Sequence, residues 1–163
     1  AANVVNGWLR DFPGPSVKCL PELDVPLEMC GTGKVIAAAT HHWAGRLGAE
    51  GAWIELRWED PEAIRAVQLV FNTGFQRELT LTSSDSINDG IIRGPQPETV
   101  RDYDILGCRS GEQDWRPLVS VTGNYQRLRR HALPPETLQA VRIQVHATNG
   151  DPLARIFEIR CLV

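Results

Sequence analysis

Residues 53–75, WIELRWEDPEAIRAVQLVFNTGF, form the stretch that most limits how this chain can fold. Apolar residues alternate with polar ones in both of its halves, with Val70 the one apolar residue out of phase, and a period of two places them on one face of a β-strand. The alternating apolar positions are Ile54, Leu56, Trp58, Val67, Leu69 and Phe71. Between the halves, Glu59-Asp60-Pro61 predicts a turn, because proline lacks the N–H that a strand ladder needs. We expect two strands joined by that turn; a helix over residues 61–70 is the alternative.

Similar alternation recurs along the chain, with Gly, Pro and Asn between the runs. The predicted strands cover residues 3–7, 77–82, 101–109, 115–121, 126–133, 140–147 and 154–162. Apart from the short run at residues 3–7, these and the central pair make about eight strands and no convincing helix, which is typical of an all-β antiparallel β-sandwich of the jelly-roll type. Residues 34–48 are expected to be a loop, and the proline-containing residues 12–34 a long surface excursion.

The inward-facing positions of these strands predict one hydrophobic core. Its expected members are Ile54, Leu56, Val67, Leu69, Phe71, Tyr103, Ile105, Val141, Ile143, Val145, Ile156 and Ile159. A chain of 163 residues is long enough for a single domain with such a core, so residues 1–163 are expected to form one domain.

The charge balance argues against two classes of partner. The net charge is -3, so no global positive field would attract nucleic acid or an anionic membrane. No apolar run approaches the length of a membrane span, and the chain begins without Met or a secretory signal. The sequence therefore reads as a soluble module excised from a larger protein.

The chain has four cysteines and no CxxC pair, which disfavours a zinc site. Cys19 and Cys30 are predicted to pair, because a disulfide closing a loop of about twelve residues stabilises by on the order of 3 kcal/mol. Such a bond favours an exported parent protein, extracellular or periplasmic. Cys108 and Cys161 fall in predicted strands, where a disulfide and buried thiols both remain open.

The most ligand-like cluster is His41-His42-Trp43 with Arg46 close behind it. An indole face stacks on the apolar side of a sugar ring, and imidazole and guanidinium groups bond hydroxyls. A metal site and a packed Trp with solvated histidines are the alternatives, although no third metal ligand stands at a recognisable spacing.

Motifs for catalysis do not assemble in this sequence. The GTGK run at residues 31–34 lacks the spacing of a phosphate loop, and no GxSxG elbow surrounds the serines at residues 83–86. The basic run at residues 127–131 alternates between two faces, as on a solvated sheet. We therefore expect a binding or accessory domain and not an enzyme.

The order of four motifs resembles the galactose-binding-like, discoidin-type β-sandwich shared by coagulation-factor C-type domains and many bacterial carbohydrate-binding modules. The motifs are NVVNG at residues 3–7, AWIELRW at 52–58, YDILGCRSGEQDW at 103–115 and AVRIQVHATNGDPLARIFEIRCL at 140–162. In that family the first turn and a carboxylate near the C-terminus often hold a structural calcium ion. The resemblance places these ligands at Asn6 and Glu158, where asparagine supplies one negative charge fewer than the usual aspartate.

A narrower resemblance covers nearly the whole chain. The runs VQLVFNTGF, GPQPETVRDY, VTGNYQRLRRH and ARIFEIRC resemble the C-terminal domain that follows the flavin-binding part of some bacterial FAD-dependent oxidoreductases. The excursion at residues 12–34 is longer than that family leads us to expect. Because GxGxxG is absent, the resemblance implies the accessory domain, without FAD of its own, next to an upstream catalytic domain.

Two functions follow as hypotheses. One is carbohydrate binding through Trp43, His41, His42 and Arg46; the other is a structural cap, without a ligand, on the flavin-binding part of the parent chain. A cap requires an exposed apolar patch of several hundred Å², whereas a sugar site is a smaller groove with polar residues around its aromatic.

Overall fold

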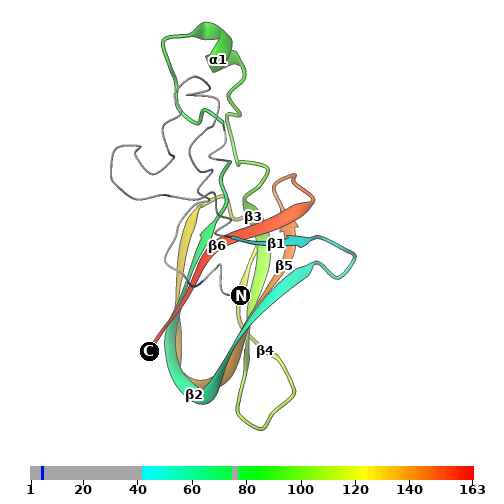
Figure 1. Ribbon diagram of the computed structural model, residues 1–163, viewed down its shortest axis with the longest axis vertical. Coiled ribbons are helices and arrows are strands. Elements are labelled where there is room, and N and C mark those ends of the chain that lie inside the picture. Colours follow the sequence, from blue (N-terminus) through cyan, green and yellow to red (C-terminus); the bar gives the residue numbers. More distant parts are fainter. Residues whose placement is uncertain (1–4, 6–41, 75–76) are drawn as a thin grey trace, which may run out of the picture.

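The computed structural model describes residue 5 and residues 42–74 and 77–163. These residues form six β-strands and one short helix (Figure 1). The strands are β1 (Trp43–Arg46), β2 (Ala52–Phe71), β3 (Val100–Cys108), β4 (Arg116–Val121), β5 (Leu128–Thr148) and β6 (Leu153–Leu162), and the helix is α1 (Asp85–Asp89). Every strand pair is antiparallel, so the predicted all-β class is confirmed, with six strands described where about eight were expected.

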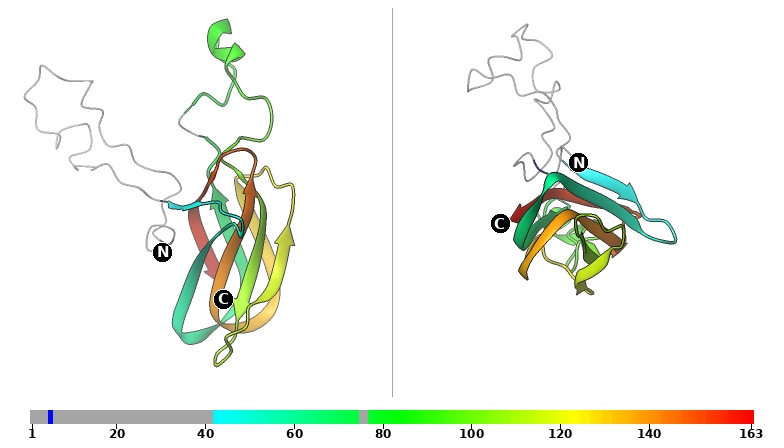
Figure 2. Two further views of the ribbon diagram at one scale, coloured as in Figure 1. Left: turned by 90° about the vertical axis from the view of Figure 1, so that its right-hand side faces the viewer. Right: turned by 90° about the horizontal axis from the view of Figure 1, so that it is seen from below.

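The sheet folds back on itself into two facing layers. Its hydrogen-bonded order is β1-β6-β2-β5-β3-β4. The first half of β2 pairs with the second half of β5, which also pairs with β3; the second half of β2 pairs with the start of β5 and with β6. Figures 1 and 2 show β2 and β5 curving together between these halves. The two bent strands thus join the layers of the sandwich at one end.

The predicted turn at Glu59-Asp60-Pro61 is wrong, because β2 continues through it. Pairing with β5 stops after Arg57 and resumes at Glu62, so residues 58–61 stand opposite the single residue Gln139. The Gln139 amide nitrogen donates to two backbone carbonyls inside this bulge. Proline is tolerated there because a bulge leaves its residues out of the ladder. The sequence signal marks a real break in pairing, which the chain accommodates by bending.

The predicted strands at residues 126–133 and 140–147 are likewise one strand, β5. Its register shifts between the pairs Ile64 with Glu136 and Ala66 with Ala132. Pro134 and Pro135 lie in that interval, so their missing N–H groups also fall where the ladder is interrupted. Prolines in both strands therefore coincide with the bend between the layers.

The core lies between the two layers. Every predicted core residue is buried except Leu56, which is partly buried against the same cluster. Tyr103 is fully buried, and its hydroxyl lies 2.9 Å from Nε2 of His131. The core prediction is confirmed because the two-residue alternation survives even where strands merge.

Two local predictions are wrong. Residues 43–46, expected as loop, form β1 because they find a partner in β6. Residues 77–82 form no strand despite their alternation, since their polar groups bond locally: the Thr82 N–H donates to Asn88 Oδ1 at 2.8 Å. The segment that follows carries α1 and extends away from the sandwich (Figure 1).

The predictions for residues 3–7 and 12–34, and the Cys19–Cys30 disulfide, lie outside the described residues. Cys108 and Cys161 are free thiols. Within the described part of the chain, no helix has the length and apolar character needed to cross a membrane.

Candidate functional site

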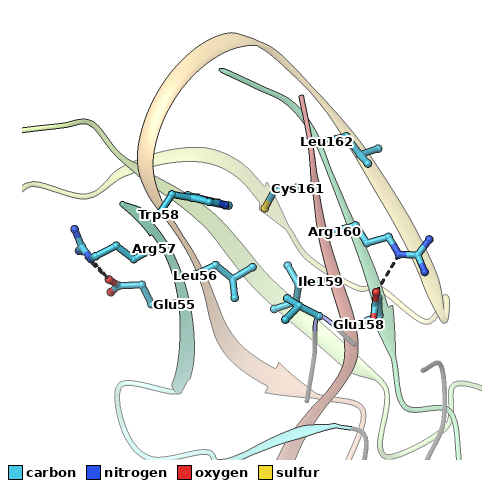
Figure 3. Close-up of a pocket in the computed structure, with 10 residues that line it drawn as sticks. Glu55, Leu56, Arg57, Trp58, Glu158, Ile159, Arg160, Cys161 and Leu162 are labelled. Atoms are coloured by element: carbon cyan, nitrogen blue, oxygen red, sulfur yellow. Dashed lines mark hydrogen bonds and ion pairs between the residues drawn. The ribbon is translucent and has the colours of Figure 1, made fainter. Parts of the chain in front are cut away.

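A groove of about 840 Å³ opens between β2 and β6. Figure 3 shows Leu56 and Trp58 of β2 on one side of it and Ile159 and Cys161 of β6 on the other. The described lining residues are Val5, Glu55, Leu56, Arg57, Trp58, Glu158, Ile159, Arg160, Cys161 and Leu162. The groove thus combines an apolar interior that includes one indole with charged residues from both strands.

The bulge in β2 explains the position of Trp58. Trp58 is the first residue beyond the regular pairing of β2 with β5, and its backbone carbonyl accepts a hydrogen bond from Gln139. Its indole is only partly buried against the core. Because β2 leaves its regular pairing with β5 at this point, part of the Trp58 ring remains exposed in the groove.

Ion pairs flank the groove on the outward side of each strand (Figure 3). In β2, Nη2 of Arg57 lies 2.8 Å from Oε1 of Glu55. In β6, Nε of Arg160 donates to Oε1 of Glu158 at 3.0 Å, and the Glu158 side chain is only 3% exposed. The groove therefore has guanidinium donors and carboxylate acceptors beside its apolar interior.

Cys161 contributes an unreactive wall to this groove. Burial raises the pKa of its thiol to about 12, so the thiol is neutral at physiological pH. A thiolate is the nucleophilic form of cysteine. The side chain acts here as a small apolar surface and not as a nucleophile.

A second aromatic feature occupies the outer face of the layer that contains β3 and β5. The guanidinium carbon of Arg142 lies 4.3 Å from the ring centroid of Trp53 and 4.1 Å from that of Trp115, both within cation–π range. Nη2 of Arg142 also lies 3.1 Å from Oε2 of Glu55. Trp53 is 53% exposed, so this stack holds an accessible indole in a defined place.

An Asp–His pair lies on the same outer face. Nε2 of His146 is 2.8 Å from Oδ2 of Asp104. Burial raises the pKa of Asp104, but hydrogen bonds from Ser120 and His146 outweigh it and lower the pKa below its usual value. Asp104 stands between the serine and the histidine, whereas nucleophilic catalysis needs the histidine between serine and aspartate. This cluster does not have the arrangement of a hydrolase triad.

Two of the residues predicted for sugar binding, Trp43 and Arg46, do not share one face of β1. Trp43 and Arg46 are three positions apart in β1, so they point to opposite sides. The Trp43 ring is partly buried against the core and lies so close to Gly45 that a Cβ there would come within 2.5 Å of it. His42 lies edge-on to Phe157 at 5.5 Å between ring centroids. His41 is outside the described residues, and sugar binding by this set stays a prediction.

The calcium prediction is only half visible. Asn6 lies outside the described residues, and Glu158 is buried and paired with Arg160. Among the residues that the structure describes, no group of three or more His, Cys, Asp or Glu could hold a metal ion. Calcium at Asn6 and Glu158 stays a prediction.

Comparison with known proteins identifies similarity in fold alone. No family model matches this chain, and no curated protein matches its sequence. Solved structures match it in architecture, among them a family 32 carbohydrate-binding module from Streptococcus pneumoniae EndoD. That module is 19% identical, with a TM-score of 0.53 and 75% of each chain covered.

Two further modules match to a similar degree. Chitosan-binding module 1 of a Paenibacillus sp. IK-5 chitosanase/glucanase is 14% identical, with a TM-score of 0.54 over 79% of this chain and 81% of that one. A Clostridium perfringens module in complex with GalNAc-β-1,3-galactose is 10% identical, with a TM-score of 0.54 over 75% of each chain. The chain shares its fold with carbohydrate-binding modules. The galactose-binding-like sandwich is therefore confirmed, whereas the oxidoreductase resemblance stays a prediction.

Sequence reasoning identified the strand that carries Trp53 and Trp58 but assigned neither indole to a site. Alternation alone distinguishes the outward Trp53 from the inward Trp58. The outward position of Trp53 in its strand is the one sequence signal for an aromatic site on the outer face of the sandwich. The groove itself had no local signal, because its second wall comes from β6, far along the chain.

Proposed function

We propose that this chain is a non-catalytic carbohydrate-binding domain and that the groove between β2 and β6 is its binding site. The observation that carries the proposal is one partly buried indole, Trp58, in a groove flanked by two Arg–Glu pairs. The neighbours in fold support it, since their names describe binding of chitosan and, for one complex, GalNAc-β-1,3-galactose.

The chemistry of the groove suits a sugar. A pyranose ring presents C–H groups on one face, which stack on an indole, and hydroxyls at its rim, which bond charged side chains. The charges of Glu55, Arg57, Glu158 and Arg160 cancel, so the groove has no excess of either sign. We therefore propose neutral saccharides as ligands in preference to uronic or sulfated ones.

Sugar binding and the cap role differ in the surface that each requires. A cap needs a contiguous apolar patch. Among the described residues the large exposed hydrophobic side chains are Val5, Trp53, Leu81, Ile87, Ile92, Tyr125, Leu128 and Val163, and three of them, Leu81, Ile87 and Ile92, lie in the connection between β2 and β3. The groove, with polar residues around an aromatic, matches the other criterion.

The direct test is a binding panel followed by titration calorimetry. The panel contains chitin, chitosan, cellulose, galactan and xylan, with an acidic polysaccharide, pectin, for comparison. Trp58→Ala should weaken binding at least about tenfold, and so should Arg160→Ala, which removes a half-exposed side chain that lines the groove. Melting temperatures identify variants that fail to fold.

Trp43→Ala is the matched control because Trp43 is the indole that the sequence predicts for sugar binding. Binding that survives Trp58→Ala and Arg160→Ala but is lost in Trp43→Ala moves the site to β1. Wild-type protein that binds no member of the panel contradicts the proposal.

The proposal extends to the setting of the domain. Following the sequence resemblance, this domain would target a larger, exported bacterial enzyme to a polymer, in the periplasm or outside the cell. The parent chain with and without residues 1–163 tests this, by turnover on a soluble and on a polymeric substrate. Loss of flavin retention or of turnover on the soluble substrate supports the structural cap; loss on the polymer alone supports targeting.

The calcium ion predicted at Asn6 and Glu158 belongs to this proposal as a structural ion. Removal of the ion would lower the free energy of unfolding, because a ligand that binds only the folded state stabilises that state. EDTA should then lower the melting temperature, and added calcium should restore it. An unchanged melting temperature contradicts a structural calcium site.

A further inference from the structure

The two indoles of β2 lie on opposite faces of one strand. Trp53 and Trp58 are five positions apart, an odd spacing that sends their side chains to opposite sides. At the rise of an extended strand they are about 16 Å apart along the chain. That span exceeds one sugar ring, so a saccharide contacting both indoles must have several units.

The outer indole is held in place and not simply exposed. Arg142 stacks on both Trp53 and Trp115, and Glu55 neutralises its guanidinium. Trp53 thus loses less rotamer freedom on contact with a ligand than an isolated surface Trp does. A fixed, 53% exposed indole is well suited to stacking.

Glu55 connects this platform to the groove. The same carboxylate lines the groove, lies 2.8 Å from Nη2 of Arg57 and lies 3.1 Å from Nη2 of Arg142. The row Arg57, Glu55, Arg142 therefore runs as a continuous polar path from the groove, over β2, to Trp53.

The far side of the platform also offers groups that bond hydroxyls. Gln144 stands opposite Trp53 in the register of β2 and β5, and its amide nitrogen donates to the Glu50 carbonyl at 2.7 Å. The His146–Asp104 pair lies two residues further along β5 on the same face. The platform is thus an indole bordered by polar side chains, as the groove is.

We propose that the binding site extends beyond the groove and that its ligand is an oligosaccharide chain. One part of the chain occupies the groove beside Trp58, and a later unit stacks on Trp53 after crossing the Arg57–Glu55–Arg142 row. This inference rests on the proposed carbohydrate-binding function and adds a second subsite and a requirement for chain length.

The test measures affinity against chain length. For the polysaccharide that binds in the panel, oligosaccharides from the monomer to the hexamer are titrated into wild-type protein, Trp53→Ala and Tyr125→Ala. Tyr125 is a matched control, since it is 65% exposed, lies in the connection between β4 and β5, and belongs neither to the groove lining nor to the stack. Wild-type affinity should rise with chain length. Trp53→Ala should lower the affinity for the longer oligosaccharides about tenfold, whereas Tyr125→Ala should leave it unchanged.

The outcomes separate this inference from the function on which it rests. Trp53→Ala that leaves the affinity for the hexamer unchanged overturns the second subsite, as does wild-type affinity that is the same at every length. A loss that is equal for monomer and hexamer also overturns it, because Trp53 would then act through the groove. Wild-type protein that binds no saccharide of any length removes the proposed function itself.

Discussion

Replacing Arg77 by alanine should destabilise the domain more than the loss of an exposed ion pair would. Nη1 and Nη2 of Arg77 donate to the two carboxylate oxygens of Glu98, both at 2.6 Å, and Nη2 also donates to Gln96 at 2.7 Å. This pairing joins the start of the connection after β2 to the segment that enters β3. The Glu98 side chain is 9% exposed and that of Arg77 26%.

The magnitude follows from that burial. Removing one partner of a fully buried pair costs about 3–5 kcal/mol, because the remaining charge loses its partner in a poorly solvated site. The partial exposure of Arg77 lets water reach the Glu98 carboxylate, which reduces the expected loss to about 2–3 kcal/mol. For a domain of this size the melting temperature should fall by roughly 4–12 °C.

Urea unfolding followed by circular dichroism measures the loss. Arg101→Ala is the control, since the Arg101–Asp102 pair has the same chemistry but an arginine that is 48% exposed; its removal should cost less than about 1 kcal/mol. Arg77→Lys should fall between the two, because lysine keeps the charge without the bidentate geometry. A loss for Arg77→Ala no larger than that for Arg101→Ala refutes the reasoning.

Three further predictions concern stability and reactivity. Burial, with the charge of a nearby arginine, lowers the pKa of His131. The unfolded chain therefore binds more protons at this residue than the folded chain does. The free energy of unfolding should then decrease as the pH falls below about 6.5, and it should decrease less in His131→Gln. With its pKa raised to about 12, the Cys161 thiol should resist iodoacetamide at pH 8 in native protein and react after unfolding; equal rates contradict its burial. Gly45→Ala should cost about 1–3 kcal/mol by displacing the Trp43 ring, whereas Gly94→Ala, with no atom within 4 Å of the added Cβ, should not; equal melting temperatures would sink this packing argument.

Local patterns determined the class of the fold and the content of its core. Alternation placed Ile54, Val67, Tyr103, Ile143 and Ile156 inside, and all are buried. This information is local, because the direction of a strand side chain depends only on its position in the alternation.

Local patterns did not determine which segments pair. Residues 77–82 alternate between polar and apolar residues, whereas the residues of β1 do not. Yet β1 is a strand because it pairs with β6, and residues 77–82 form hydrogen bonds locally instead. Pro61 reads as a turn, but Gln139 from β5 satisfies the carbonyls beside it and lets β2 continue. A strand is stabilised by its partner, which the sequence of the strand itself does not contain.

The candidate site depends even more on tertiary structure. Alternation predicted that Trp58 faces inward, but only the position of β6 makes that inward face a groove, with Ile159 and Cys161 as its second wall. Trp53 becomes a fixed platform because Arg142, from a distant part of the chain, stacks on it and on Trp115. Side-chain direction is a local property of the backbone, whereas a cavity or a stack exists only where the fold brings remote segments together.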